Sequence, residues 1–140
     1  MIREQSRDWF DYLSKALQEL TSSTPIPFKG LMPSKIPAKP GVYLISVTMG
    51  KTELPYYVGR SKNLRQRLYN NHLMGPINNA ILKRYLIAFK ECTDLKHAKN
   101  FIKENCLARW FLEDDTRKRG AVEGYVVGVV FPKYGIYEEH

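Results

Sequence analysis

The sequence predicts an α+β fold in which a few short strands pack against amphipathic helices. Residues 42–59 contain two runs rich in β-branched and aromatic side chains, and the turn sequence MGKTEL separates them, which predicts an antiparallel hairpin. On both sides of this hairpin, apolar residues recur at the spacing that is typical of helices. The length of 140 residues suits one globular domain.

The first forty residues predict a helix and a connector. Between Arg3 and Leu20 the apolar residues form one stripe, which is typical of an amphipathic helix. Residues 21–40 hold five of the eight prolines, so regular structure is not expected there. We therefore expect an N-terminal helix with a Pro-rich connector over residues 1–38 and the main domain over residues 39–140.

The main domain is expected to contain three strands with helices between them. The hairpin strands are Val42–Thr48 and the sequence PYYVG at 55–59, and the third strand is Cys106–Leu112. Helices are expected to begin at capping residues, namely Ser61 or Asn63 for a helix through about Leu73, Asn78 or Asn79 for the next, and Asp94 for the last.

The segment AVEGYVVGVVF, residues 121–131, is ambiguous from its residues alone. Its β-branched content favours a strand. Gly120, Gly124 and Gly128 recur at i, i+4 and i+8, however, and on a helix they would form one smooth stripe. Local propensity leaves helix and strand both open.

The charge distribution favours a polyanionic partner. The chain has 22 Lys and Arg against 14 Asp and Glu, a formal net charge of +8. A solvated helix face usually mixes both signs, because opposite charges one turn apart support each other. No acidic residue lies between Glu53 and Glu91, so this interval predicts a phosphate-facing surface. Its basic residues are Arg60, Lys62, Arg65, Arg67, Lys83, Arg84 and Lys90.

The sequence gives little support to other classes of function. Cys92 and Cys106 form no C-x-x-C motif and no cluster with a histidine, which argues against structural zinc and against a disulfide framework. The first residues hold no apolar signal region, and no apolar run approaches the length of a membrane span. We expect a soluble cytoplasmic protein with no membrane partner.

Four features follow one another in a fixed order along residues 39–135. They are GVY at 41–43, YVG at 57–59, Arg67 ten positions after Tyr57, and Glu123 at the head of EGYVVGVVFPKYG. In this order and spacing they resemble the GIY-YIG nuclease family. The resemblance implies a compact domain with a small three-stranded antiparallel sheet flanked by helices, which cuts phosphodiester bonds with one divalent metal ion. It also implies that Glu123 lies on a helix and points to the face from which both tyrosines emerge.

The resemblance implies a catalytic role for each motif residue. Tyr43 would orient or deprotonate the attacking water, although a phenol with a pKa near ~10 needs a nearby cation or partner to do so. Tyr57, the second motif tyrosine, would be a further catalytic residue, although a merely supporting hydrogen bond would look similar. Arg67 would bind the non-bridging phosphate oxygens, and Glu123 would hold Mg²⁺ or Mn²⁺. Structural roles stay open as alternatives, namely tyrosines packed in a strand, a solvated arginine and a glutamate paired with a nearby arginine.

Further basic residues are candidates for binding the nucleic acid, and double-stranded DNA is the expected substrate of this endonuclease. Sequence specificity would come from the N-terminal helix and connector, from assembly into a homodimer, or from the structure of the DNA. The candidate binding residues are Arg60, Lys62, Arg65, Lys83 and Arg84.

Two departures from the family pattern leave a second function open. The position four residues after the motif arginine, often His or Tyr in the family, is Asn71, and His72 follows one residue later. One more residue turns a side chain by about 100° on an ideal helix, so we expect His72 to reach the catalytic site only if the helix frays. The family pattern often closes with asparagine, where this chain has Gly135, and Lys133 or Tyr134 would have to substitute for it. The alternative is a catalytically weakened or inactive nucleic-acid-binding module.

Overall fold

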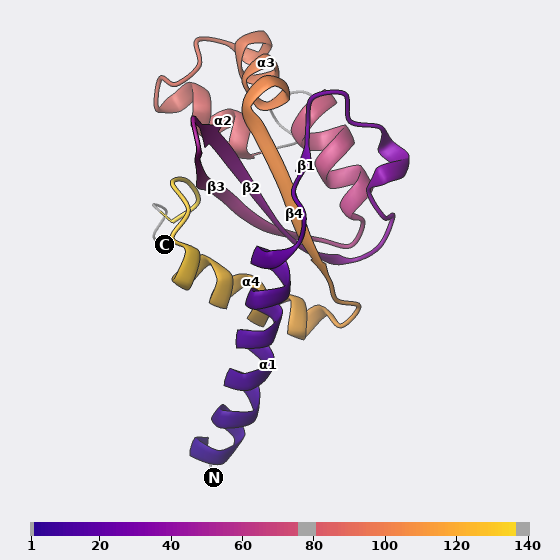
Figure 1. Cartoon of the computed structure of the whole chain (residues 1–140), viewed down its shortest axis with the longest axis vertical. Helices are drawn as coiled ribbons and strands as arrows, with labels where there is room; N and C mark the ends of the chain where they lie inside the picture. The colour runs from indigo at the N-terminus through magenta and orange to yellow at the C-terminus, as the bar shows by residue number, and fades with distance from the viewer. Residues whose placement is uncertain (1, 76–80, 137–140) are drawn as a thin grey trace.

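A computed structural model describes residues 2–75 and 81–136 of the chain. Within these ranges an antiparallel sheet of four strands, in the order β1-β4-β2-β3, is flanked by helices (Figure 1). The predicted hairpin is formed by β2 (Gly41–Met49) and β3 (Thr52–Ser61), and β4 (Cys106–Leu112) pairs with the other edge of β2. The expected α+β class is confirmed.

The described part of the sheet has four strands rather than the expected three, because β1 (Ile26–Pro27) forms within the Pro-rich connector. Ile26 lies opposite Ala108 of β4, and the amide of Phe28 donates to the carbonyl of Cys106 at 3.1 Å. A proline has no amide hydrogen to donate, so it is tolerated in an edge strand such as β1. The ring of Phe28 is buried and anchors the connector to the core.

Two of the described helices begin at aspartate caps. The Asp94 side chain accepts a hydrogen bond from the His97 amide at 2.8 Å, which confirms the predicted cap, and Asp115 accepts from the Lys118 amide at 2.9 Å. Asn78 and Asn79, the expected start of another helix, lie outside the described residues. The described helices are α1 (Ile2–Ser22), the short 3-10 helix Pro33–Lys35, the π-helix η2 (Gln66–Met74), α2 (Ile81–Ala88), α3 (Leu95–Asn105) and α4 (Thr116–Val130).

The ambiguous segment 121–131 is helical, since α4 continues to Val130. Phe131 ends it in the left-handed conformation, with a φ of 55°, and its amide still donates to the Val127 carbonyl. Within the described ranges, none of the helices is long and apolar enough to cross a membrane.

The sheet separates two apolar clusters. On one face, Val42, Leu44 and Val58 pack with side chains of α1 and α4. The other face carries Tyr43 and Tyr57 and packs against the helices η2, α2 and α3. The expectation that Glu123 lies on a helix is confirmed, but that helix, α4, packs on the face of the sheet opposite to both tyrosines rather than on their own face (Figure 1).

Gly41, the glycine of the GVY motif, lies where β2 meets both β4 and the start of the helical segment that follows β3. It pairs with Leu112 on one side and with Ser61 on the other. A Cβ at this position would stand 2.6 Å from the Phe111 carbonyl oxygen and 2.8 Å from Leu64 Cδ1. Because one of these neighbours is backbone, the position has no room for a side chain.

Gly41→Ala is expected to lower the free energy of unfolding by about 1–3 kcal/mol, the usual cost of overpacking a buried position. Gly124→Ala is the matched control, because nothing lies within 4 Å of a Cβ there and alanine favours a helix. Urea unfolding of both variants checks this. Equal midpoints for the two would show that the sheet adjusts without strain at Gly41.

Candidate active site

The hydroxyl of Tyr43 lies across β3, directly over Gly59 of the YVG motif. The two residues are cross-strand partners, and a Cβ on Gly59 would stand 2.4 Å from Tyr43 Oη. Only glycine can therefore occupy position 59 while the tyrosine ring lies here. Tyr57 is on the same side of the sheet, and the two tyrosine ring centroids are 6.3 Å apart.

A β-bulge brings a further tyrosine to this side. Ile45 pairs with Tyr57, but the next residue of β2, Ser46, pairs with Pro55, so that Tyr56 is an extra residue on β3. A bulge breaks the alternation of side chains along a strand. Tyr56 and Tyr57 consequently both belong to the same apolar cluster.

His72 reaches Tyr43 because its helix has π-helical winding. Its Nε2 lies 2.8 Å from Tyr43 Oη, and both side chains are fully buried. A π-helix bonds each amide to the carbonyl five residues earlier, so residues five apart, such as Arg67 and His72, share a face. The expectation that the helix must fray is corrected. The helix stays wound, but its hydrogen bonds span five residues instead of four, so His72 and not Asn71 faces Tyr43.

Arg67 completes the group around the phenol. Its Nε donates to Tyr43 Oη at 3.3 Å. Burial acts to lower the pKa of the guanidinium, but the hydroxyls of Tyr43 and Tyr57 raise it overall through charge and hydrogen bonding, so it stays charged. Since Arg67 can only donate, the hydroxyl proton of Tyr43 remains available to a neutral His72 Nε2.

The protonation states follow from burial. Burial raises the pKa of Tyr43 above its ordinary value, with Tyr57 adding to this and Arg67 opposing it. Burial, and then the charges of Arg67 and Lys83, hold the pKa of His72 well below its ordinary 6.5. Its Nδ1 is buried without a hydrogen-bond partner in the part of the chain that the structure describes. A neutral imidazole beside a protonated phenol is an acceptor for the phenol's proton.

Glu123 approaches the tyrosines from the far face of the sheet, at the edge formed by β3. Burial raises its pKa, which Arg60 opposes, and its carboxylate contributes to the raised pKa of Tyr43. The side chain is 27% exposed, and Arg60 Nη1 lies 3.4 Å from its Oε1. The charge of Glu123 therefore acts on the Tyr43 site although the two side chains belong to opposite faces.

A single, partly exposed carboxylate such as that of Glu123 fits a hard cation such as Mg²⁺, which commonly binds through one or two carboxylates and keeps several waters. The described ranges contain no group of three or more His, Cys, Asp or Glu side chains that would hold a metal among themselves. Water and substrate phosphate would have to supply the other ligands. Glu123 thus fits as the protein's contribution to such a site.

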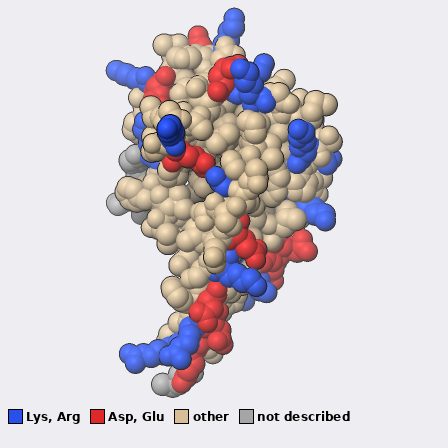
Figure 2. All heavy atoms as spheres, in the orientation of Figure 1, with Lys and Arg blue, Asp and Glu red and all other residues tan. Residues whose placement is uncertain are grey.

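The candidate nucleic-acid ligands have different surroundings. Arg60, Lys62 and Arg84 are exposed. Arg65 is half-buried, and its Nε donates to the Ile36 carbonyl of the connector at 2.8 Å. In the view of Figure 2, basic side chains spread around the body, while basic and acidic ones intermingle along the projecting α1.

Lys83 is not a surface residue, which corrects its expected contact with nucleic acid. It is fully buried, and its Nζ donates to the carbonyl oxygens of Asn71, at 2.7 Å, and of Gly75. Burial, with a smaller effect of the charge on Lys99, lowers the pKa of Lys83 to about 8. The residue holds the end of η2, a role with no local signal because its partners lie 8 and 12 residues earlier.

Lys133 and Tyr134 precede Gly135, the position at which the family often has asparagine, and both bind another residue. Lys133 Nζ and the Tyr134 hydroxyl both bind Glu91, which also accepts from the Tyr56 hydroxyl at 2.8 Å. Neither side chain replaces an asparagine at the site. Gly135 has a φ of +98°, and a Cβ there would lie 3.3 Å from the Tyr57 ring, so this segment forms a wall beside Tyr57.

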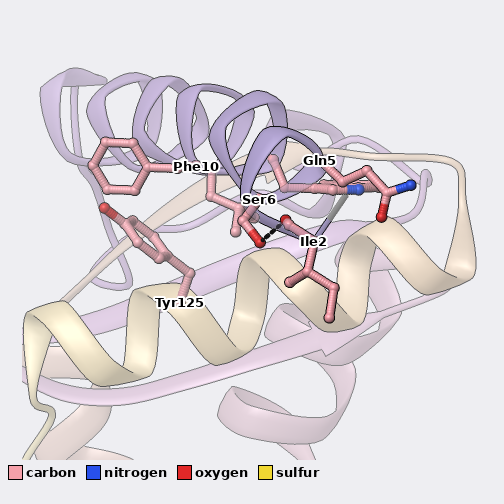
Figure 3. A pocket seen from close by; sticks show the side chains of 7 residues that line it. Ile2, Gln5, Ser6, Phe10 and Tyr125 are labelled. Atoms are coloured by element: carbon pink, nitrogen blue, oxygen red, sulfur yellow. Dashed lines mark hydrogen bonds between the residues drawn. The ribbon is translucent and has the colours of Figure 1, made fainter.

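A cleft of about 610 Å³ lies elsewhere, between the first half of α1 and Tyr125 of α4 (Figure 3). Its wall includes Ile2, Trp9 and Phe10, and the phenol of Tyr125 points toward α1. None of the residues of the Tyr43 site lines it. The cleft is therefore separate from the candidate active site.

Solved structures to which the chain is similar include the GIY-YIG N-terminal endonuclease domain of UvrC from Thermotoga maritima. A point mutant bound to its catalytic divalent cation matches with a TM-score of 0.44 and 19% identity, over 72% of this chain and 87% of that chain. The domain bound to magnesium matches with a TM-score of 0.40 and 20% identity, over 72% and 88%. No protein-family model and no curated protein matches the chain. These solved domains are GIY-YIG endonuclease domains, the family that the sequence motifs resemble.

The buried neutral imidazole makes stability depend on pH. The unfolded chain binds a proton at His72 near pH 6.5, whereas the folded chain resists it to much lower pH. Stability is therefore expected to fall as pH drops below about 6.5, by up to about 1.4 kcal/mol per unit from this residue. Urea unfolding between pH 7.5 and 5.5 should show a smaller loss for His72→Gln than for the wild type. Parallel losses in both proteins would contradict a depressed pKa.

Proposed function

We propose that the chain is a metal-dependent endonuclease that hydrolyses phosphodiester bonds of nucleic acid, with double-stranded DNA as its substrate. The observation that carries the proposal is the position of the Tyr43 hydroxyl between His72 Nε2, at 2.8 Å, and Arg67 Nε, at 3.3 Å. This arrangement places a phenol beside a neutral base and a cation, which are the two aids that a phenol needs to act on water near neutral pH.

Tyr43 would take a proton from the attacking water while its own proton passes to His72. His72 Nε2 is unprotonated and within hydrogen-bond distance of the phenol, but burial and the charge of Arg67 hold the pKa of His72 low, so the transfer requires Arg67 to move away. Tyr43 is fully buried, whereas Arg67 is half-buried. We therefore expect Arg67 to turn toward the incoming phosphate, which both binds the anion and uncovers the phenol oxygen.

Arg67 and Glu123 would stabilise the charge of the transition state. The planar guanidinium can hold two non-bridging phosphate oxygens at once. Glu123 would hold Mg²⁺ or Mn²⁺, and a cation bound there supplies countercharge to the phosphate and to the leaving oxygen. The exposed Arg60, Lys62 and Arg84 would contact the nucleic-acid backbone at neighbouring phosphates.

A second candidate function is a nucleic-acid-binding module with weak or no turnover. Two observations favour it: Gly135 offers no polar side chain beside Tyr57, and Tyr43 is buried from solvent. The domain boundary between residues 38 and 39 stays a prediction, and so does assembly into a homodimer.

The metal assignment is tested by Glu123→Gln. Nicking of supercoiled plasmid in Mg²⁺ or Mn²⁺ should be lost, because the amide keeps the shape but deletes the anion. The melting temperature should stay at or above that of the wild type, because the substitution removes a charge whose burial opposes folding.

The alternative is a glutamate with a purely structural role, for which the same change would lower the melting temperature and leave any nicking dependent on metal. Glu113→Gln is the matched control for loss of a half-buried carboxylate. A folded Glu123→Gln protein that nicks plasmid as fast as the wild type would remove the metal site and most of the mechanism.

Arg67→Ala should reduce the cleavage rate about 10²- to 10³-fold, the usual effect of removing one donor to the transition state. Arg67→Lys keeps the positive charge but not the planar guanidinium that binds two oxygens at once, so its cleavage rate should lie between those of the alanine variant and the wild type. DNA affinity in EDTA should change far less, because the neighbouring basic residues remain. Equal losses of affinity and rate in plasmid nicking would reduce Arg67 to a contact residue.

A further inference from the structure

The carboxylate of Glu123 has a protein cation beside it. Arg60 Nη1 lies 3.4 Å from Glu123 Oε1, with 52% of the Arg60 side chain and 27% of the Glu123 side chain exposed. Arg60 is in β3, immediately after Gly59, and Glu123 is in the middle of α4. The contact therefore links the end of the YVG motif to the residue proposed to hold the metal.

The surface of α4 is shaped to receive this guanidinium. Gly120 lies three residues before Glu123, and a Cβ there would stand 2.9 Å from Arg60 Nη1. Gly124, the next glycine of the same stripe, has nothing within 4 Å of an added Cβ. The room for Arg60 thus depends on one particular glycine of the helix.

Two positions of Arg60 exclude each other. A guanidinium held against the carboxylate neutralises it and repels a divalent cation approaching the same oxygens. The same guanidinium is exposed enough to bind a phosphate, and arginine–phosphate pairs are strong because they are charge-assisted and often bidentate. An arriving phosphate and Glu123 therefore compete for Arg60, while Arg60 and the metal compete for Glu123.

We propose that Arg60 is a counter-ion switch: it neutralises Glu123 in the free protein and moves to a phosphate of bound nucleic acid, which releases Glu123 to a divalent cation. The proposal rests on the proposed function in one respect, the assignment of Glu123 to the metal. Nucleic acid and metal then bind cooperatively, and by linkage each raises the affinity for the other by the same factor.

The metal half of the switch is tested by titrating the full chain with Mn²⁺ in the absence of nucleic acid, with free Mn²⁺ measured by electron paramagnetic resonance. Arg60→Gln should bind Mn²⁺ about two- to fivefold more tightly than the wild type, the range set by a partly exposed ion pair. Lys62→Gln is the control for general loss of positive charge, since Lys62 is exposed and two residues away.

Gly120→Ala tests the same contact with the charge retained. The atom in its way is the end of a flexible side chain, so Arg60 is displaced rather than the helix, and alanine favours the helical conformation. This variant should also bind Mn²⁺ more tightly than the wild type. Gly124→Ala makes the same chemical change one turn along α4 and should bind Mn²⁺ as the wild type does.

The phosphate half is tested in EDTA, where a labelled duplex is bound without metal. Glu123→Gln should bind the duplex more tightly than the wild type, because Arg60 is then free to pair with a phosphate. In an Arg60→Gln background the same change should have a smaller effect, and this double-mutant cycle isolates the part that passes through Arg60. Fluorescence anisotropy at one fixed salt concentration gives the four affinities.

The outcomes separate the switch from the proposed function. If Glu123→Gln binds Mn²⁺ as well as the wild type does, the metal assignment itself fails. If Glu123→Gln loses Mn²⁺ while Arg60→Gln and Gly120→Ala match the wild type, Glu123 remains the ligand and the switch is overturned. A gain in Lys62→Gln or Gly124→Ala equal to that of its partner variant, or an additive double-mutant cycle, also overturns it.

Discussion

The candidate site depends on one close contact, the hydroxyl of Tyr43 over the backbone of Gly59. The contact requires that the two residues stand opposite each other on β2 and β3. A shift of register by one residue would place Val58 or Arg60 across from the tyrosine and reverse the faces of the strand. The tight hairpin between Met49 and Thr52 and the bulge at Tyr56 together set this register, because the bulge shifts the pairing by one residue and so brings Gly59 opposite Tyr43. The glycine of YVG is therefore needed for packing, and its chemical effect is to let the phenol oxygen reach the β3 edge.

The π-helical winding of η2 is the second constraint on the site, because it decides which residue of the helix reaches Tyr43. With ordinary α-helical winding Asn71 would share a face with Arg67, and the buried phenol would lose its base. The wider ladder brings His72 to that place instead. Lys83 holds the carbonyls at the end of this turn from inside the protein. A lysine is costly to bury, so its presence here is consistent with a helix end that has few other partners.

Structural features that depend on residues close together in the chain could be predicted from the sequence, whereas those that depend on contacts between distant residues could not. The hairpin, β4 and the Asp94 cap could be predicted because alternation and capping act over a few residues. The strand β1 could not, because Ile26 pairs with Ala108, far along the chain. The burial of Lys83 and the face taken by α4 likewise depend on packing between distant segments. His72 was a candidate from the sequence, but the way it reaches Tyr43 could not be predicted, because a π-helix differs from an α-helix in its hydrogen bonds and leaves no local signal in residue spacing.

In the free protein, the two arginines of the site bind oxygen atoms of the protein itself. Arg67 binds the Tyr43 hydroxyl, and Arg60 lies beside Glu123. In the proposed mechanism, each of these arginines would exchange a protein oxygen for a phosphate oxygen when nucleic acid binds, so part of the binding energy would be used to open the site. Such use of binding energy is productive only if the new contacts are strongest in the transition state. In the proposed mechanism, the contacts of the free protein would keep the phenol of Tyr43 from solvent, and Arg60 would keep the carboxylate of Glu123 from a metal, until a substrate is present. A closed Tyr43 is therefore compatible with an enzyme, provided that the phosphate itself supplies the opening.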